Sequence, residues 1–148
     1  MRRVHVSERV PYTAAQMFDL VNDVEAYPRF LHWCRDARIE SRHDNVVVAS
    51  LDIGISGIHK SFKTRNVLDR PRSIDMQLVS GPFRRLEGGW RFEDLGAEGA
   101  RVSLDLEFEV DPSPFSLVFS LMFEELGRTQ MAAFIARART VYGAAGAR

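Results

Sequence analysis

The sequence is poor in cysteine and has no long apolar run. Its single cysteine, Cys34, cannot close an internal disulfide and cannot by itself form a thiolate zinc cluster. No apolar segment approaches the ~20 residues of a membrane span, and the basic residues at the start are not followed by the apolar stretch of an export signal. We therefore expect a cytoplasmic protein in which residues 1–148 form one domain.

Sequence motifs of catalysis and of metal binding are also missing. The four histidines lie far apart, and none has the spacing of a metal site such as His-Glu-x-x-His. There is no Gly-x-Ser-x-Gly elbow and no glycine-rich phosphate loop. Cys34 lies near His32, but no third group that would orient a nucleophile is recognisable, and a buried structural cysteine is the simpler interpretation. We predict that the protein is not an enzyme and requires no metal or cofactor.

The net charge is zero, yet charged residues are segregated along the chain. Residues 59–91 contain eight basic and three acidic residues, whereas residues 92–126 contain one basic and nine acidic residues. Such blocks are often ordinary solvated strand faces, and we expect this for the acidic block. The basic block is also a candidate contact surface for RNA or anionic lipid, but not for DNA. Its candidate contact residues are Lys60, Lys63, Arg65, Arg84 and Arg85.

Apolar residues alternate with polar ones over most of the chain. Residues 102–110 are apolar at every even position and polar at every odd one, which puts Asp105, Glu107 and Glu109 on the wet face of a strand. Similar runs between residues 35 and 110 are separated by turn signals and predict six consecutive strands. A strand over residues 4–10 makes a seventh. One wet and one dry face indicate an antiparallel sheet.

Helix signals flank this sheet region. Thr13 and Gln16 form a capping box that predicts a short helix ending at residues 22–23, and a second short turn should end before Pro28. Ser113 and Pro114 predict the start of a long C-terminal helix that ends at Gly143. Its apolar positions recur at helical spacing from residue 115 to residue 141. The predicted fold class is α+β: a curved seven-stranded antiparallel sheet around the long helix, with two short helices after the first strand.

The interior must hold many large side chains, because the chain contains ten phenylalanines, two tryptophans and five methionines. A sheet that curves around a helix does not automatically fill its hollow, and an unfilled apolar hollow is a site for a lipid. The alternative is a solidly packed core, which is common for aromatic-rich interiors.

Several segments resemble one family. The stretch Tyr27-Pro28-Arg29-Phe30-Leu31-His32-Trp33-Cys34 and the stretch from Gly81 to Phe92 are similar to the coenzyme Q-binding START-like family, within the polyketide cyclase/START superfamily. So are segments 10–12, 48–53, 62–66 and 106–110, so the resemblance extends over about residues 3–143. His32 departs from the proline that is usual in this family and could loosen the loop near the mouth of the cavity.

The resemblance implies a helix-grip (START/Bet v 1-like) fold with an apolar cavity between sheet and helix. It also implies binding of a polyprenyl quinone, with ubiquinone as the bound ligand, by a carrier or chaperone that supports respiratory electron transfer. The basic block could, instead of contacting RNA, dock on anionic lipid at the inner face of the plasma membrane during quinone exchange. Trp33, Thr64, Asn66 and Trp90 are candidate partners of the headgroup. The expected binding residues are Phe30, Trp33, Leu51, Phe62, Thr64, Trp90, Leu106, Phe108, Phe119, Met122, Phe123 and Leu126.

Two other functions stay open at this point. Bacterial members of the family include RatA-type toxins, which are named for binding the large ribosomal subunit and blocking subunit association. Aromatase/cyclases are related helix-grip proteins in which a similar cavity folds a reactive chain. We rank the enzyme last, because no acid–base constellation is recognisable in the sequence.

Overall fold

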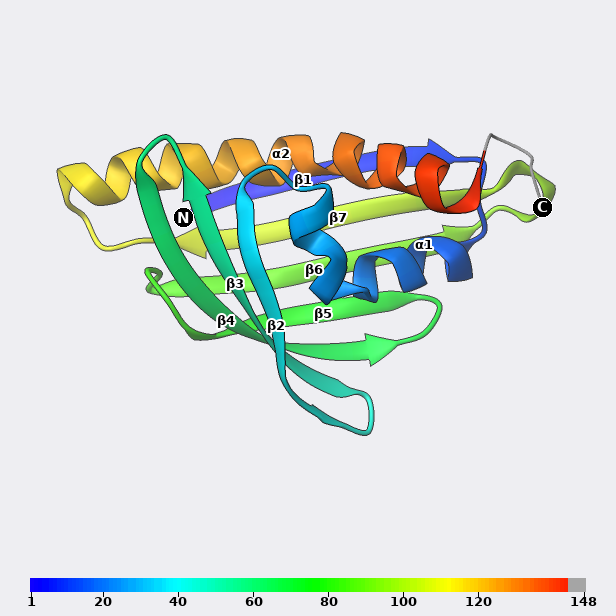
Figure 1. Ribbon diagram of the computed structural model, residues 1–148, viewed down its shortest axis with the longest axis horizontal. Helices are drawn as coiled ribbons and strands as arrows, with labels where there is room; N and C mark the ends of the chain where they lie inside the picture. Colours follow the sequence, from blue (N-terminus) through cyan, green and yellow to red (C-terminus); the bar gives the residue numbers. More distant parts are fainter. Residues whose placement is uncertain (144–148) are drawn as a thin grey trace.

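The structure is a computed structural model that describes residues 1–143. Its seven strands form one antiparallel sheet in the order β1-β7-β6-β5-β4-β3-β2, which confirms the predicted six-strand meander (Figure 1). The first strand pairs with the last, a position that the sequence did not predict. None of its helices is long and apolar enough to cross a membrane. The elements are β1 (Arg2–Val10), α1 (Ala14–Asn22), η1 (Val24–Arg29), β2 (Cys34–His43), β3 (Val46–Ile55), β4 (Ile58–Asp69), β5 (Ser73–Ser80), β6 (Arg85–Asp94), η2 (Gly96–Glu98), β7 (Ala100–Glu109) and α2 (Pro114–Tyr142).

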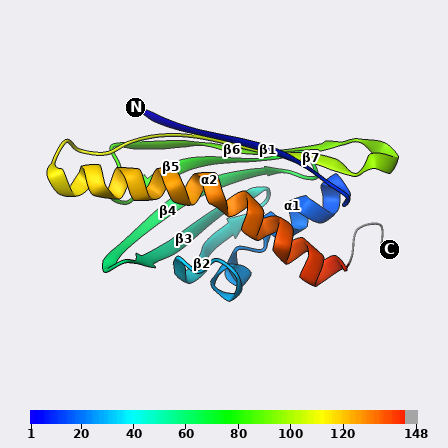
Figure 2. The same ribbon diagram turned by 90° about the horizontal axis from the view of Figure 1, so that it is seen from above.

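The sheet curves, and α2 lies across its concave side (Figures 1 and 2). The helix contacts β1, β7 and α1. The short helices α1 and η1 lie beside the second half of α2 (Figure 2). The helix α1 contacts β6, β7 and α2, and η1 contacts β2. This arrangement confirms the predicted α+β, helix-grip architecture and encloses the space in which a ligand could lie.

Capping begins α1 as the sequence predicts. The Thr13 hydroxyl accepts a hydrogen bond from the Gln16 backbone N–H (3.0 Å), and the Gln16 side chain accepts one from the Thr13 N–H (2.9 Å). The expected stop before Pro28 is wrong, because η1 continues through Pro28 to Arg29. The 3₁₀ conformation has a φ close to the value that a proline ring imposes, so the proline fits inside this short helix.

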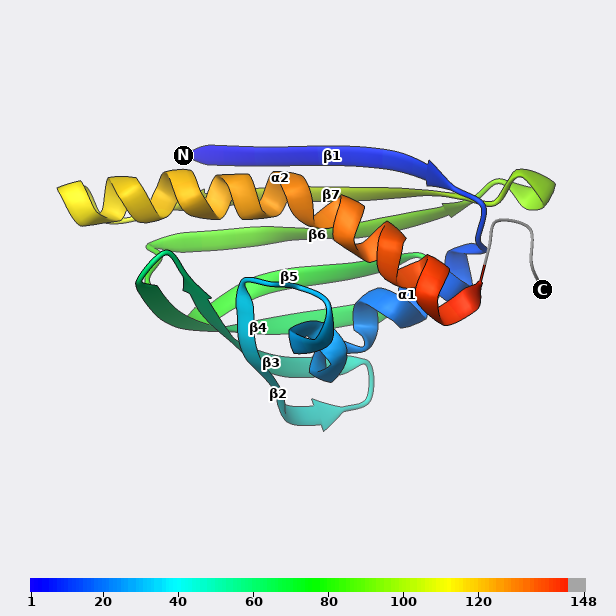
Figure 3. The ribbon, with the colours of Figure 1, turned by 45° about the horizontal axis from the view of Figure 1, so that its top comes forward.

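The ends of α2 are also those predicted. Its Ser113 cap accepts a hydrogen bond from the Ser116 N–H (3.1 Å), and the helix ends at Gly143, whose φ of 92° suits glycine. The hydroxyl of Tyr12 donates to the Gly143 carbonyl (2.7 Å) and so fixes this end. In contrast, Phe115 is 89% exposed, and the prediction that the packed face begins there is wrong. The first turns of α2 extend past the ends of β1 and β7, so they have no sheet to pack against (Figure 3).

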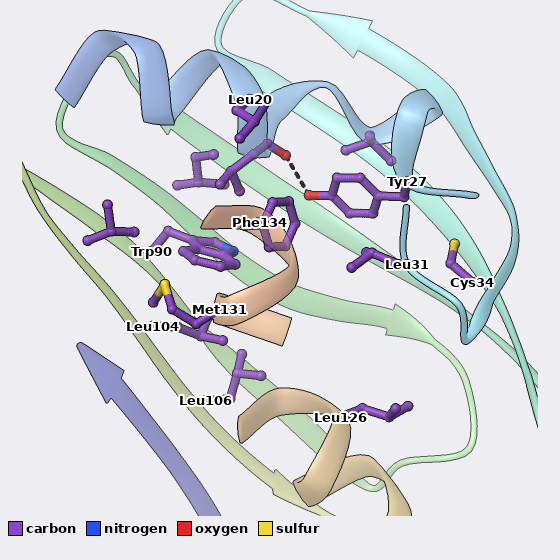
Figure 4. Packing of buried hydrophobic residues seen from close by; sticks show 14 of the residues in the cluster. Leu20, Tyr27, Leu31, Cys34, Trp90, Leu104, Leu106, Leu126, Met131 and Phe134 are labelled. Atoms are coloured by element: carbon purple, nitrogen blue, oxygen red, sulfur yellow. Dashed lines mark hydrogen bonds between the residues drawn. The ribbon is translucent and has the colours of Figure 1, made fainter. Parts of the chain in front are cut away.

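The core lies between the sheet and the second half of α2 (Figure 4). Phe134 is 1% exposed, and its ring makes edge contacts with Tyr27 and Trp90, at centroid distances of 5.3 and 5.2 Å. The buried Tyr27 hydroxyl donates to the carbonyl of Val21 (2.5 Å), and burial raises the pKa of this tyrosine. Aromatic packing therefore joins η1, β6 and α2 into one cluster.

The outer face of the sheet is solvated, as the alternation predicts. Asp105 accepts a hydrogen bond from His5 across the β1–β7 pair (2.6 Å), and Glu107 pairs with Arg3 (2.9 Å). Both carboxylates are exposed, so the acidic cluster on β7 is part of a surface and not a buried acid–base pair.

Candidate functional site

A cavity of about 80 Å³ lies between the concave face of the sheet and α2. Its wall comes from η1, the loop before β2, strands β3 to β7 and the middle of α2. The lining residues are Val24, Tyr27, Trp33, Ala49, Leu51, Phe62, Thr64, Asn66, Met76, Leu86, Trp90, Leu106, Phe123, Leu126, Gly127 and Gln130. Because most of these side chains are apolar, the cavity suits the hydrocarbon part of a ligand.

Most of the sequence-predicted binding residues meet at this wall. Those that line the cavity are Trp33, Leu51, Phe62, Thr64, Trp90, Leu106, Phe123 and Leu126. They come from five different elements and the loop before β2, and the sheet pleat together with the position of α2 brings them to one space.

Two polar side chains on β4 interrupt the apolar wall. Thr64 and Asn66 follow Phe62 at alternate positions, so all three point to the concave face. The Thr64 hydroxyl donates to the Asn66 carbonyl oxygen (2.9 Å), and each residue is only 7% exposed. The Asn66 amide nitrogen makes no hydrogen bond within residues 1–143, although every fully buried side-chain polar atom there has a partner. That nitrogen therefore faces the open cavity and can donate to a ligand.

Other donors surround the same space. The indole N–H groups of Trp33 and Trp90 and the side-chain amide of Gln130 make no hydrogen bond with any residue the structure describes. Trp90 is held by its neighbours: its ring stacks on Phe92 at 6.2 Å. The cavity thus combines an apolar wall with a few N–H donors, an arrangement that fits a hydrophobic molecule carrying one or two acceptor oxygens.

Four predicted binding residues lie outside the wall. Phe30 is half-buried against Phe134 (5.3 Å), with the Arg137 guanidinium over its ring (5.2 Å). Phe108 and Phe119 are buried beside Phe83, at centroid distances of 6.1 and 5.4 Å, and do not reach the cavity. Met122 is half-buried, one position before the lining residue Phe123. An inward-facing position predicts burial, but other side chains already occupy the space next to these four.

The phenylalanine cluster fills the hollow beside the cavity. It consists of Phe62, Phe83, Phe108, Phe119 and Phe123. Phe83 and Phe108 each lie 4.9 Å from Phe123, between ring centroids. Since Phe62 and Phe123 also line the cavity, this cluster forms one of its walls.

Sequence reasoning missed several lining residues. Gly127 brings α2 close to β1, since a Cβ there would lie 3.3 Å from both methyl carbons of Val4. A lone glycine inside a helix was the available signal for this close approach. Nothing in the sequence marks Gln130 and Met76 as lining residues, because polar or flexible side chains of this kind are common at half-buried positions. Tyr27 is part of the Tyr-Pro segment but was not assigned to the wall.

Ion pairs neutralise much of the basic block. Arg70 makes two hydrogen bonds to Asp19 (both 2.8 Å), and these hold the pKa of that carboxyl below its ordinary value. Arg84 lies 3.8 Å from Glu109, and Arg85 pairs with Glu87 (2.5 Å). The other ion pairs are Arg72–Asp69, Arg91–Asp75 and Arg84–Asp111. Within residues 1–143, Lys60, Lys63 and Arg65 are the block's basic residues without an ion pair.

The other candidate for chemistry is Cys34. It is buried, and burial raises the pKa of its thiol to about 11, so the thiolate nucleophile is disfavoured at neutral pH. His32 is exposed in the loop before β2. No group of three or more potential metal ligands occurs in residues 1–143.

The chain is similar in sequence to proteins of a known family. The family described as polyketide cyclase / dehydrase and lipid transport matches residues 10–135. The chain is 42% identical to the Ribosome association toxin RatA of Escherichia coli, over 97% of this chain and 91% of that protein. It is 26% identical to the mitochondrial coenzyme Q-binding protein COQ10 homolog B of Xenopus laevis, over 96% of this chain and 61% of that protein.

Solved structures share the architecture. An 18 kDa protein from Caulobacter crescentus is 36% identical, with a TM-score of 0.77, over 97% of this chain and 100% of that one. An aromatase/cyclase from Streptomyces sp. R1128 is 20% identical, with a TM-score of 0.80, over 99% of both chains. The second likeness shows a shared fold alone.

Proposed function

The chain belongs to the START-like family described as polyketide cyclase / dehydrase and lipid transport, and on this premise we propose that its cavity binds a polyprenyl quinone. The observation that carries the proposal is the Thr64–Asn66 pair on the apolar wall. A quinone has carbonyl oxygens that only accept hydrogen bonds, and the unpartnered Asn66 amide nitrogen is a donor. The name of the Xenopus relative, a coenzyme Q-binding protein, supports the same ligand class.

We propose binding without chemical turnover, in a carrier or chaperone for respiratory electron transfer. The relatives that are more than 40% identical are named as toxins and not as enzymes. Burial of the ligand's tail alone provides affinity, at about 0.8 kcal/mol for each methylene removed from water. The donors then select the headgroup and its orientation.

Ligand entry requires the cavity to expand. Its volume of about 80 Å³ is below the roughly 300–1,000 Å³ of pockets for drug-sized ligands. The phenylalanine cluster occupies the adjacent hollow, and its rings contact one another mostly edge-on, with Phe119 stacked on Phe123. We propose that these rings rotate and α2 shifts outward when the polyprenyl tail enters.

The chain has a built-in reporter of this binding. Its two tryptophans, Trp33 and Trp90, both line the cavity. A short-tailed ubiquinone added to delipidated protein should therefore quench the intrinsic fluorescence in a saturable way. Mass spectrometry of lipid that copurifies with the protein would identify the tail. The proposal is wrong if no quinone quenches the fluorescence and no isoprenoid lipid copurifies.

The headgroup contact has a matched test. The double variant Thr64→Val/Asn66→Leu replaces both hydrogen-bonding partners by apolar groups of similar shape, which leaves no unpaired polar atom. We expect it to fold and to bind the quinone about tenfold more weakly, through the lost donor. Gln77→Leu makes the same kind of change at an exposed position of β5 and should bind as the wild type does. Equal affinity in the double variant and the wild type would exclude Asn66 as the headgroup donor.

A second candidate function is association with the large ribosomal subunit, because relatives 42–43% identical are named for ribosome association. Lys63 and Arg65 support it as basic residues of β4 without an ion pair in the described chain. Contacts with RNA phosphates would make the affinity fall steeply with salt. This candidate places the protein in the cytoplasm, where ribosomes are.

Ribosome gradients test this second candidate. Added protein should lower the ratio of assembled ribosomes to free subunits, and the variant Lys63→Glu/Arg65→Glu should not. Arg42→Glu is the control. Arg42 is exposed at the end of β2 and lies opposite Val47 in the strand register, so its side chain is on the concave side of the sheet and not on the face of Lys63 and Arg65. An unchanged ratio with the wild-type protein removes this function.

A further inference from the structure

The first turns of α2 expose a set of large apolar side chains. Phe115 is 89% exposed, and Leu117, Val118 and Leu121 are each more than half exposed. Residues 112–123 contain no charged residue. These turns project beyond the sheet, so nothing in the described chain covers them (Figures 1 and 3). Contiguous exposed apolar surface of this kind marks a contact site.

Two turns of the sheet lie at the same end of the molecule. They are the β3–β4 turn and the β5–β6 turn (Figures 1 and 2). We define the apolar end as residues 54–60, 79–85 and 112–123. These segments contain three basic residues, Lys60, Arg84 and Arg85, and no acidic residue. Arg84 pairs with Glu109 and Asp111, and Arg85 pairs with Glu87, so Lys60 is the basic residue of this end without an ion pair in residues 1–143. The end therefore combines apolar side chains with one unpaired positive charge.

The apolar end is continuous with the cavity wall. Phe115, Phe119 and Phe123 lie four residues apart on α2 and so share one face of the helix. Phe115 is exposed, Phe119 is buried, and the ring of Phe123, 5.9 Å from that of Phe119, lines the cavity. A row of phenylalanines thus leads from the exposed tip to the interior.

We infer that the apolar end docks onto the surface of a lipid bilayer that contains anionic headgroups. Apolar side chains of α2 would enter the boundary between headgroups and acyl chains, and Lys60, which has no ion pair in residues 1–143, would contact the headgroups. A second copy of the chain fits less well, because it would bring the unpaired Lys60 of both copies to one apolar interface. RNA fits less well, because Leu117, Val118 and Leu121 are aliphatic and offer no ring on which a base could stack. The choice of a bilayer rests on the proposed lipid ligand, which is stored in membranes.

Vesicle sedimentation tests this docking. The wild-type protein should sediment with phosphatidylcholine vesicles that contain phosphatidylglycerol, and more weakly with phosphatidylcholine alone. Phe115→Ser/Leu121→Ser changes exposed side chains only and should weaken binding by at least about tenfold. Val141→Ser is the matched control, since Val141 is 48% exposed at the opposite end of the same helix. Lys60→Gln should weaken binding about fivefold on the anionic vesicles and leave binding to the neutral ones unchanged.

Each remaining outcome has a defined meaning. Docking is refuted if the wild type stays in the supernatant, or if the double variant sediments as the wild type does. Docking is also refuted if the wild type forms a concentration-dependent dimer, the double variant does not, and neither binds vesicles. That result would assign the apolar end to contact with a second copy of the chain. Quenching by a soluble short-tailed quinone is measured separately. If the double variant still shows quenching, docking is a step separate from ligand binding. If the wild type binds vesicles but shows no quenching, the proposed cavity ligand is rejected and the docking is not.

Discussion

At the scale of single residues, Cys34 shows how burial controls reactivity. Burial raises the pKa of its thiol to about 11, so the folded protein favours the neutral form. We expect iodoacetamide to alkylate the folded protein at pH 8 roughly a hundredfold more slowly than the chain unfolded in urea, because the thiolate fraction is lower by that factor. Equal rates in the two states would show that the thiol is accessible and ionised.

The same shift makes stability depend on pH. A thiol whose pKa is raised in the folded state contributes stability that is fully present below about pH 9 and is lost as the pH rises to about 11. Urea titrations of the wild type should therefore show a falling free energy of unfolding over this range. In Cys34→Ser the fall should be smaller. An identical pH dependence in both proteins would contradict the assignment to Cys34.

Residue-level patterns predicted burial better than they predicted contact with the cavity. The period of two placed Phe62 and Thr64 on the concave face, and both line the cavity. The same reasoning applied to Phe108, which is buried but packs against Phe83 and Phe123. Whether an inward side chain meets a void or another ring depends on residues distant in the sequence, and periodicity contains no information about them.

At the scale of elements, the capping box of α1 gives a direct stability test. Thr13→Ala removes the side-chain acceptor of the Gln16 N–H and should lower the free energy of unfolding by about 1 kcal/mol. Thr140→Ala is the control, since its exposed hydroxyl donates only to the Ala136 carbonyl (3.3 Å) of its own helix. We expect its effect to stay within about 0.5 kcal/mol. Urea denaturation followed by circular dichroism measures both, and equal losses would disprove a special role for the cap.

Local signals located the ends of elements more accurately than their partners. Ser113 and Gly143 bound α2 as predicted, because caps act over a few residues. The exposure of Phe115 was not predicted, because it depends on the helix being longer than the sheet beneath it. The length of an element follows from its own sequence, but the surface available to it is set by the other elements.

At the scale of the whole molecule, filling the cavity should change stability and binding in opposite directions. Ala49 lines the cavity and is 3% exposed, so Ala49→Leu places three more carbons in the empty volume. We expect the free energy of unfolding to rise by about 0.5–2 kcal/mol and the quinone affinity to fall at least about tenfold. Ala138→Leu is the control: this alanine is fully buried outside the cavity, and overpacking there should cost about 1–3 kcal/mol. Destabilisation by Ala49→Leu would mean that no usable space exists beside Ala49.

The architecture itself followed from the sequence. Alternation gave the strands, and a one-sided sheet with a single long helix leaves few arrangements. The resemblance through the segment from Tyr27 to Cys34 indicated the family that the comparisons confirm. The volume of the cavity could not be predicted from the sequence. Its value of about 80 Å³ is a small difference between two large volumes, the one enclosed by the backbone and the one that the side chains fill.

The pairing of the first strand with the last has a consequence for synthesis of the protein. Arg2 pairs with Phe108, so β1 has no strand partner until nearly all of the sheet has been translated. At about 5–20 residues per second, this delay lasts roughly 5–20 seconds. During that interval the nascent chain displays an unsatisfied edge that other polypeptides could join. Messages truncated before β7 should therefore yield insoluble products, and the timing of elongation becomes part of how this fold is obtained.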